Sequence, residues 1–277
     1  MNAKIAIIHF NTPELTEACI LSIRKHGCDW PIVVFDNSAD LTVPAGTAGN
    51  SPKEELHIKA HPFKKKMKGV KIIDNTKGQV IDFDKFLADY PERNKQIGVF
   101  KSSVWGSAKH IYTVQKLWEL LPDGFILVES DILVKADIRD LWKEQYSFCG
   151  YVQRNQYGNK FKVPRILPML CYMNVPLLTK EGARYFDPDR CWGLKADIND
   201  KGNWFDTGAC MLDDVLKKRP RLKGLHVDIR PIVAHYGGGS WHQNDTTQQK
   251  KWLEQHKDLW FIDSKPNPEK STNRKGK

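Results

Sequence analysis

The chain has 277 residues, of which 40% are hydrophobic and 27% are charged, a composition that is typical of globular proteins and argues against disorder. No apolar run approaches the roughly 18 residues that a membrane-spanning helix needs. The net charge of +10 comes from two segments. Residues 57–77 hold seven lysines against Asp74, and residues 265–277 hold five basic residues against Glu269. The rest of the chain is therefore balanced in charge.

These two basic segments have two interpretations. They are a solvated loop and a disordered basic tail over 265–277, or they attract an anionic surface such as membrane lipid, a polyanionic glycan or nucleic acid. The six cysteines lie far apart, without the close pairs of zinc or redox sites, so we expect reduced thiols in a cytoplasmic protein. The N-terminus reads as a first strand rather than as a signal peptide.

The N-terminal elements predict a parallel sheet. "KIAIIHF" (residues 4–10) is an apolar strand, and a helix follows, with Thr12 as its N-cap, Pro13 at its first position and Gly27 at its end. "PIVVFDNSAD" (residues 31–40) is a second buried strand. A strand, a helix and another apolar strand form a βαβ unit, whose two strands run parallel.

The middle of the chain continues this alternation. Residues 40–69 read as an irregular loop, and 70–78 as a third strand. Residues 107–124 predict a helix, because apolar residues recur at helical spacing until a Pro-Asp-Gly sequence ends it. "GFILVESDILV" (residues 124–134) then reads as one strand, followed by a short helix capped by Asp137.

The C-terminal half is less regular. "FCGYV" (residues 148–152) predicts a strand, whereas residues 154–205 show no clear pattern. Residues 206–220 predict a helix capped by Asp206, residues 225–234 a strand that opens into a glycine loop, and 246–260 a final helix. We expect one α/β catalytic domain over residues 1–264, with a nucleotide-binding part at about 1–135 and an acceptor-side part at about 136–264.

Two carboxylates interrupt the strand at 124–134. Glu129 and Asp131 directly follow its apolar core, and residues i and i+2 of a strand point to the same face. Two like charges held that close repel each other unless a cation lies between them. We therefore expect Mn²⁺ or Mg²⁺, which take oxygen ligands; the alternative is that the strand ends at Val128 and both acids face solvent.

A second candidate ligand follows another strand. His235 leaves the apolar stretch "RPIVA" and enters three successive glycines, which let backbone amides approach a phosphate closely. Imidazole suits a transition metal such as Mn²⁺. Taken singly, His235 is more often a core histidine and Gly237–Gly239 a plain turn, but together with the acidic pair they make a metal–diphosphate site plausible.

The order of these motifs resembles a known family. "SAKHIYTVQKLWELLPDGFILVESDILVKADIRDLW" resembles the middle of GT-A-type glycosyltransferases, closest to the retaining family of glycogenin and the lipopolysaccharide galactosyltransferases. Glu129-Ser130-Asp131 stands where that family has Asp-x-Asp, and Lys109 where it often has Arg. "WFDTGACML" and "HYGGGSW" are similar to its acceptor-side segment and to its metal- and diphosphate-binding loop. The stretch "HFNTPELTEACILSI" is equally similar to the large inverting GT-A family, so inversion and retention both stay open.

The resemblance implies a GT-A-like, Rossmann-type α/β fold with a mostly parallel central sheet flanked by helices. It also implies transfer of a sugar from a nucleotide-diphosphate donor, first of all a UDP-sugar, to a hydroxyl acceptor on a glycan or glycolipid. Glu129, Asp131 and His235 would hold the metal. Several residues are expected to contact the donor: Lys109, Gly238, Gly239 and Ser240 at the diphosphate, Trp241 by stacking on a sugar ring, and His9, Asn11, Thr12 and Asp36 at the base. Asp36 is equally readable as a loop cap.

Asp206 has two interpretations, as a helix N-cap or as the catalytic residue that faces the donor sugar or deprotonates the acceptor. Asp213 and Asp214 are rival bases. Two other functions stay open: a polyanion- or nucleic-acid-binding protein, which the absence of a binding motif disfavours, and a metal-dependent phosphohydrolase. Contact with an anionic membrane through the basic loop and tail is compatible with the transferase.

Overall fold

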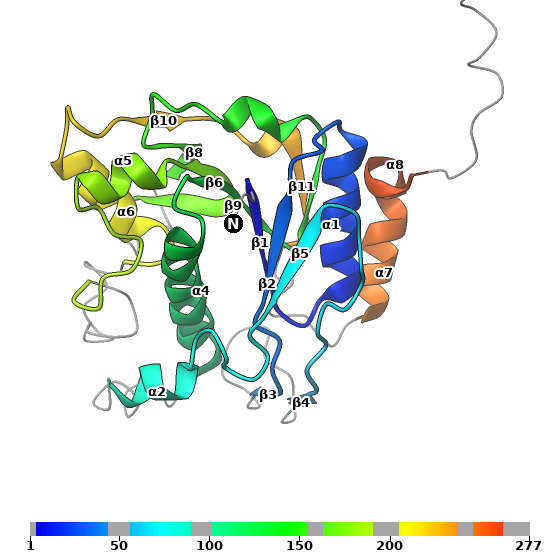
Figure 1. The fold of residues 1–277 in the computed structure, drawn as a ribbon. Helices are drawn as coiled ribbons and strands as arrows, with labels where there is room; N and C mark the ends of the chain where they lie inside the picture. The colour runs from blue at the N-terminus through cyan, green and yellow to red at the C-terminus, as the bar shows by residue number, and fades with distance from the viewer. Residues whose placement is uncertain are drawn as a thin grey trace, which may run out of the picture.

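The computed structural model describes residues 4–43, 56–89, 101–154, 163–190, 205–237 and 246–262. Within these ranges the centre is a seven-stranded sheet of order β10-β8-β9-β6-β1-β2-β5 (Figure 1). Four of its six strand pairings are parallel, and β9 runs antiparallel to both β6 and β8. The predicted α/β fold with a mostly parallel sheet is thus confirmed. Its strands are β1 (Ile5–His9), β2 (Ile32–Asp36), β5 (Val70–Asp74), β6 (Phe125–Glu129), β8 (Phe148–Gln153), β9 (Arg165–Met173) and β10 (Gly224–His226).

Helices cover both faces of the sheet, and each face has its own apolar core (Figure 1). Ile5 and Ile7 of β1 pack in the core with α1, whereas Ala6 and Ile8 pack in the core with α4, as alternation along a strand requires. The two cores bury these strands on both faces, which is why they are apolar throughout. The helices are α1 (Pro13–Lys25), with α7 (Thr246–Gln255) and α8 (Lys257–Trp260) packed against it, and α4 (Lys101–Leu120), α5 (Val175–Lys180) and α6 (Ala209–Lys217) on the opposite face.

The N-terminal βαβ unit is present as predicted. β1 and β2 run parallel, with His9 beside Asp36 at the carboxyl end of the pair. Thr12 is the N-cap residue of α1, although its side chain makes no capping hydrogen bond, and Pro13 begins the helix. The unit therefore brings the polar residues after both strands to one edge of the sheet.

Four predictions of secondary structure need correction. The expected loop at 40–69 contains an antiparallel pair, β3 (Leu41–Val43) with β4 (Leu56–Ile58). The expected single strand at 124–134 is two, because β7 (Ile132–Val134) leaves the central sheet to pair with β11 (Val233–His235). The expected strand at 225–234 is divided into β10, the 3₁₀ helix η3 (Arg230–Ile232) and β11. Residues 154–205, for which no element was predicted, include β9. Pro168 lies where the β8–β9 register shifts, a position at which a strand tolerates proline and at which sequence periodicity fails.

Smaller elements complete the described chain. Asp137 caps the 3₁₀ helix η2 (Ile138–Leu141) by accepting a hydrogen bond from Arg139 N–H, as predicted. A short helix α2 (Phe83–Ala88) precedes α4, and the 3₁₀ helix η3 (Arg230–Ile232) leads into β11. The five cysteines in the described ranges are free and buried. None of the described helices is both long and apolar enough to cross a membrane.

One sheet contains strands from both predicted parts of the chain. β1, β2, β5 and β6 come from residues 1–135, and β8, β9 and β10 come from residues 136–264. This continuity supports a single catalytic domain, which stays a prediction together with its boundaries. The tail at 265–277 lies outside the described residues.

Candidate metal centre

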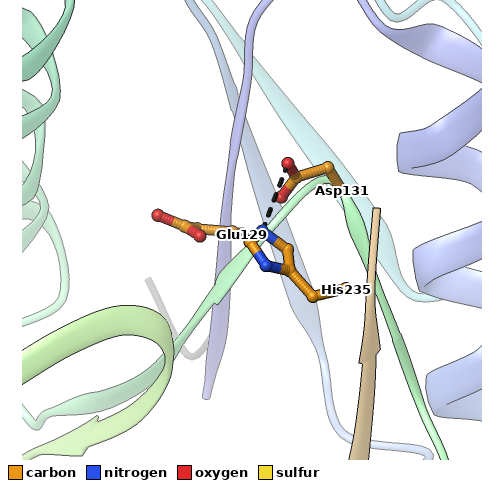
Figure 2. A group of neighbouring side chains, drawn as sticks. All are labelled: Glu129, Asp131 and His235. Atoms are coloured by element: carbon orange, nitrogen blue, oxygen red, sulfur yellow. Dashed lines mark ion pairs between the residues drawn. The ribbon is translucent and has the colours of Figure 1, made fainter. Parts of the chain in front are cut away.

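Glu129, Asp131 and His235 come together at the end of β6 (Figure 2). Each offers one ligand atom, and these atoms all lie within 4.8 Å of one another. His235 Nε2 is 3.5 Å from Asp131 Oδ2. Two oxygen ligands and one imidazole nitrogen form a donor set that fits Mn²⁺, and Mg²⁺ through its carboxylates. The predicted ligands are therefore brought together, and we call them the triad.

The local fold explains this convergence. β6 is buried up to Val128, and the chain turns at Ser130 and Asp131 as it leaves the central sheet. β7 then pairs antiparallel with β11, which places His235 opposite Ile132. The N–H of Tyr236 donates to the carbonyl of Asp131 at 3.0 Å and holds the two segments together. Backbone pairing thus delivers His235 beside Asp131, although the two lie far apart in the sequence.

The electrostatics of the triad favour a cation. Burial and the nearby charge of Asp131 raise the pKa of Glu129 to about 8. Burial alone would lower the pKa of His235, but the hydrogen bond and charge of Asp131 outweigh it, so this pKa is raised. For Glu129, burial is the larger cause and the charge of Asp131 the second, and both disfavour the ionised form of this carboxylate. A divalent ion supplies the missing positive charge and favours the ionised carboxylates.

An ion pair lies beside the triad. Arg165, the first residue of β9, pairs with Asp206, and its Nε donates to Gln153 Oε1 at 2.9 Å. Both charged side chains are mostly buried, with 13% and 15% of their surface exposed. The charge of Arg165 lowers the pKa of the Glu129 carboxyl, and the charge of Asp206 raises it. The pair and the triad therefore form one cluster of charged side chains, which we call the polar group.

A glycine explains why Asp206 lies against β9. Gly208 has φ +77°, a conformation that favours glycine, and a Cβ atom there would come within 2.3 Å of the Ile166 carbonyl oxygen. Only glycine therefore lets this backbone approach the strand so closely. The contact fixes the segment that carries Asp206 next to Arg165.

The structure corrects the predicted cap. α6 begins at Ala209 with Gly208 as its N-cap residue, and no side chain caps it. Asp206 instead accepts a hydrogen bond from the N–H of Thr207 at 2.7 Å, in addition to pairing with Arg165. The N-cap thus lies two residues later than predicted, because Asp206 pairs with Arg165 and Gly208 makes the close approach to β9.

The rival bases are held by other partners. Asp213 and Asp214 both pair with Arg190, at 2.7 and 2.8 Å. Asp214 also accepts from the N–H of Arg184 at 3.0 Å. These bonds hold both carboxylates in place at α6. Among the described residues, Asp206 lies in the polar group around the triad, whereas Asp213 and Asp214 bond to Arg190 and Arg184.

The residues expected at the nucleotide base contact the chain itself. We call residues 59–63 the edge segment. Its Phe63 N–H donates to Asp36 Oδ2 at 2.7 Å, its His61 N–H donates to Asn11 Oδ1 at 3.0 Å, and the His61 carbonyl lies 3.0 Å from His9 Nε2. Thus the edge segment already uses these three side chains at the carboxyl ends of β1 and β2.

His9 and Asp36 are fully engaged there. Burial lowers the pKa of His9, and its Nδ1 lies 2.7 Å from the Thr16 hydroxyl, so both ring nitrogens have partners. The other oxygen of Asp36 accepts from Ser38 N–H at 2.9 Å. This agrees with the loop-capping interpretation of Asp36. Contact of these residues with a nucleotide base stays a prediction.

The remaining predicted donor contacts are placed as follows. Thr12 is buried at the start of α1, where its carbonyl accepts from Thr16 N–H at 3.0 Å. The ammonium of Lys109 lies 5.0 Å from the centre of the Phe83 ring, and burial lowers its pKa. Gly237 has φ +71°, so the glycine loop starts in a conformation that favours glycine. Gly238, Gly239, Ser240 and Trp241 lie outside the described residues.

Three residues of the polar group or next to it were not singled out as site residues from the sequence: Arg165, Gln153 and His110. Arg165 lies in the segment that showed no periodicity. His110 had a signal, because it stands at i−4 and i−7 from Val114 and Leu117 on the apolar face of its helix. A polar residue on a buried face requires a partner or a function.

No protein-family model and no curated protein sequence matches this chain. Its fold is similar to the apo structure of the bifunctional glycosyltransferase WbbM, at 11% identity and TM-score 0.40 over 82% of this chain and 39% of that one. It is also similar to the galactosyltransferase LgtC in complex with donor and acceptor sugar analogues, at 13% identity and TM-score 0.45 over 95% and 98% of the two chains. An active-site mutant of LgtC matches at 14% identity and TM-score 0.34, over 62% of this chain and 57% of that one.

This chain spans less than half of the WbbM chain and nearly all of the LgtC chain in the first of its two structures. All three structures are of glycosyltransferases.

Proposed function

We propose that this chain is a metal-dependent glycosyltransferase that moves a hexose from a nucleotide-diphosphate sugar, with UDP as the first candidate, to a hydroxyl of a glycan or glycolipid. The observation that carries the proposal is the triad of Glu129, Asp131 and His235 at the end of a central strand. In open α/β sheets ligands bind outside the carboxyl ends of the strands, which is where the triad lies.

The triad fits the chemical difficulty of the reaction. The diphosphate leaving group gains negative charge as its bond to the sugar breaks, and a divalent ion stabilises such charge when it is bound. Glu129, Asp131 and His235 would hold that ion. Arg165 and Asp206 lie beside it with opposite charges, and Asp206 is our candidate for the residue that contacts the donor sugar or takes the acceptor proton.

Metal and nucleotide should bind together. We expect UDP to raise the melting temperature only when Mn²⁺ or Mg²⁺ is present, because the diphosphate completes the coordination of the ion. Differential scanning fluorimetry with UDP, with Mn²⁺ and with both checks this expectation. ADP and GDP are the matched nucleotides for base preference, and an equal effect of UDP without metal would contradict the proposal.

Product analysis separates the transferase from the two alternatives. Incubation with a UDP-hexose, Mn²⁺ and a set of soluble glycosides should give UDP together with a new glycoside. Proton NMR of its anomeric signal decides between inversion and retention. A phosphohydrolase would instead release nucleoside monophosphate or phosphate without any acceptor, and a polyanion binder would show neither product but a steep loss of affinity with salt.

We further propose that an anionic membrane surface is a partner. Residues 64–71, which we call the lysine segment, expose Lys64, Lys66, Lys68 and Lys71, and none of these four forms a salt bridge within the described ranges, although Lys64 lies near enough to act on the carboxyl of Asp74. Lys65, between them, pairs with Glu17 of α1. Exposed lysines outside ion pairs are attracted to anionic lipid, at about 1 kcal/mol for each one near the surface.

The double variant Lys64→Gln/Lys66→Gln should bind vesicles that contain phosphatidylserine about 30-fold more weakly than the parent chain, since two such lysines contribute about 2 kcal/mol. Co-sedimentation with the vesicles measures the change. Lys180→Gln/Lys223→Gln, which removes two exposed lysines elsewhere, is the control and should bind as the parent does. Equal binding of all three chains would remove the lysine segment from the proposal.

A further inference from the structure

Two hydrogen-bonding atoms of His110 have no partner among the residues that the structure describes. Both of its ring nitrogens are buried, although the residue as a whole is only half-buried. Buried polar atoms in folded proteins almost always have a partner, because leaving one without costs stability. Two unsatisfied nitrogens on one buried ring indicate that the ring bonds to a group other than the described residues.

The surroundings of His110 point to the proposed active site. Asp206, Asp131 and Arg165 all act electrostatically on its imidazole, so the ring lies near the triad and the Arg165–Asp206 pair. α4 carries it there from the face of the sheet opposite α1. None of these three charged groups forms a hydrogen bond with the ring. Asp206 pairs with Arg165, and Asp131 pairs with His235.

A second unsatisfied atom borders the same polar group. The hydroxyl of Tyr185 is buried without a partner, and Glu129, Asp206 and Arg165 act on it electrostatically. Its side chain is 1% exposed, so this hydroxyl is enclosed behind the group. Unsatisfied polar atoms thus gather around the charges that the proposed reaction uses, as expected of a binding site that lacks its ligand.

The protonation of the ring selects the kind of ligand. Burial lowers the pKa of His110 to about 4, so the imidazole is neutral near pH 7. A neutral imidazole has one N–H donor and one acceptor nitrogen. A hydroxyl group can bond either ring nitrogen, by accepting from the N–H or by donating to the other nitrogen, whereas a phosphate at neutral pH mainly accepts and can bond only the N–H.

We propose that His110 is a specificity-determining residue that hydrogen-bonds a sugar hydroxyl of the substrate near the triad and the Arg165–Asp206 pair. The proposal rests on the proposed glycosyl transfer. The hydroxyl belongs to the donor hexose or to the acceptor sugar, and the two sources share this chemistry. In the absence of substrate the two unsatisfied ring nitrogens lower the stability of the fold. The site keeps the ring because it recognises the substrate.

The test replaces His110 by phenylalanine, which keeps a planar ring and removes both nitrogens. In calorimetry with Mn²⁺, His110→Phe should bind UDP as the parent chain does and should bind UDP-glucose and UDP-galactose at least tenfold more weakly. Its melting temperature without ligand should equal or exceed that of the parent, because two unsatisfied atoms are gone. His26→Phe is the matched control, since His26 is also half-buried with an unsatisfied nitrogen but lies at the far end of α1.

Each outcome has a definite meaning. Weaker binding of the UDP-hexoses alone assigns the hydroxyl to the donor, whereas unchanged UDP-hexose binding with a tenfold higher KM for a soluble glycoside assigns it to the acceptor; both support the proposal. Equal affinities and equal KM in the parent chain and His110→Phe overturn it while leaving the glycosyltransferase intact. If the parent chain binds neither UDP nor a UDP-hexose in the presence of Mn²⁺, the proposed function itself is overturned.

Discussion

Asp131→Ala should lower sugar transfer by about a thousandfold and abolish the joint stabilisation by UDP and Mn²⁺. Asp131 is the member of the triad that contacts His235 and whose charge acts on Glu129, so its loss removes one ligand and releases a second. Steady-state turnover with a UDP-hexose and a thermal shift series with Mn²⁺ measure the two effects.

The fold should survive this change. Removing Asp131 also removes its repulsion of Glu129, which offsets the lost contact with His235, so the melting temperature without metal should stay within a few degrees of the parent value. Asp140→Ala serves as control, because Asp140 is an exposed acid shortly after β7. Undiminished stabilisation by UDP with Mn²⁺ in Asp131→Ala would refute the triad as the metal site.

Asp206→Asn should lower turnover by about a hundredfold or more, because an amide cannot accept a proton at neutral pH. It should also lower the free energy of unfolding by about 2 kcal/mol, since the charged bond to the mostly buried Arg165 becomes a bond to a neutral oxygen. Turnover under saturating donor and chemical denaturation followed by tryptophan fluorescence give the two numbers. A pure helix cap would have predicted no change in either, because Asn caps as well as Asp.

A second variant separates catalysis from charge balance. In Asp206→Asn/Arg165→Gln no guanidinium is left without its carboxylate, so much of the lost stability should return. If Asp206 acts on the substrate, turnover stays low in this double variant. If Asp206 serves only to neutralise Arg165, turnover recovers together with stability, and the catalytic assignment fails.

The triad was predictable from the sequence because each of its parts follows a buried strand. Apolar runs that end at Glu129 and at His235 locate two strand ends, and ligands of α/β sheets bind at such ends. The convergence itself comes from the antiparallel pairing of β7 with β11. The same reasoning could not see that β7 leaves the central sheet. Pairing between distant segments depends on partners, and a three-residue apolar strand is read equally well as a continuation of the strand before it.

Other features had no local signal. The hydrogen bonds of the edge segment to Asn11 and Asp36 join residues that lie far apart in the sequence, and that segment has no periodicity. The pairing of Arg165 with Asp206 was hidden because β9 contains Pro168, which the propensity rules place outside a strand. The predicted cap at Asp206 was wrong for a related reason, since a close approach of Gly208 to β9 decides where α6 starts.

The pairing of β7 with β11 also sets the order of events during synthesis. His235 leaves the ribosome about a hundred residues after Asp131, a delay of about 5 to 20 s at ordinary translation rates. A nascent chain can fold the β1–α1–β2 unit and present both carboxylates during that interval, yet it lacks the imidazole that completes the set. A chain that stalls or is cut before Val233 therefore has an acidic pair that binds a metal weakly, and tight metal binding requires translation past His235.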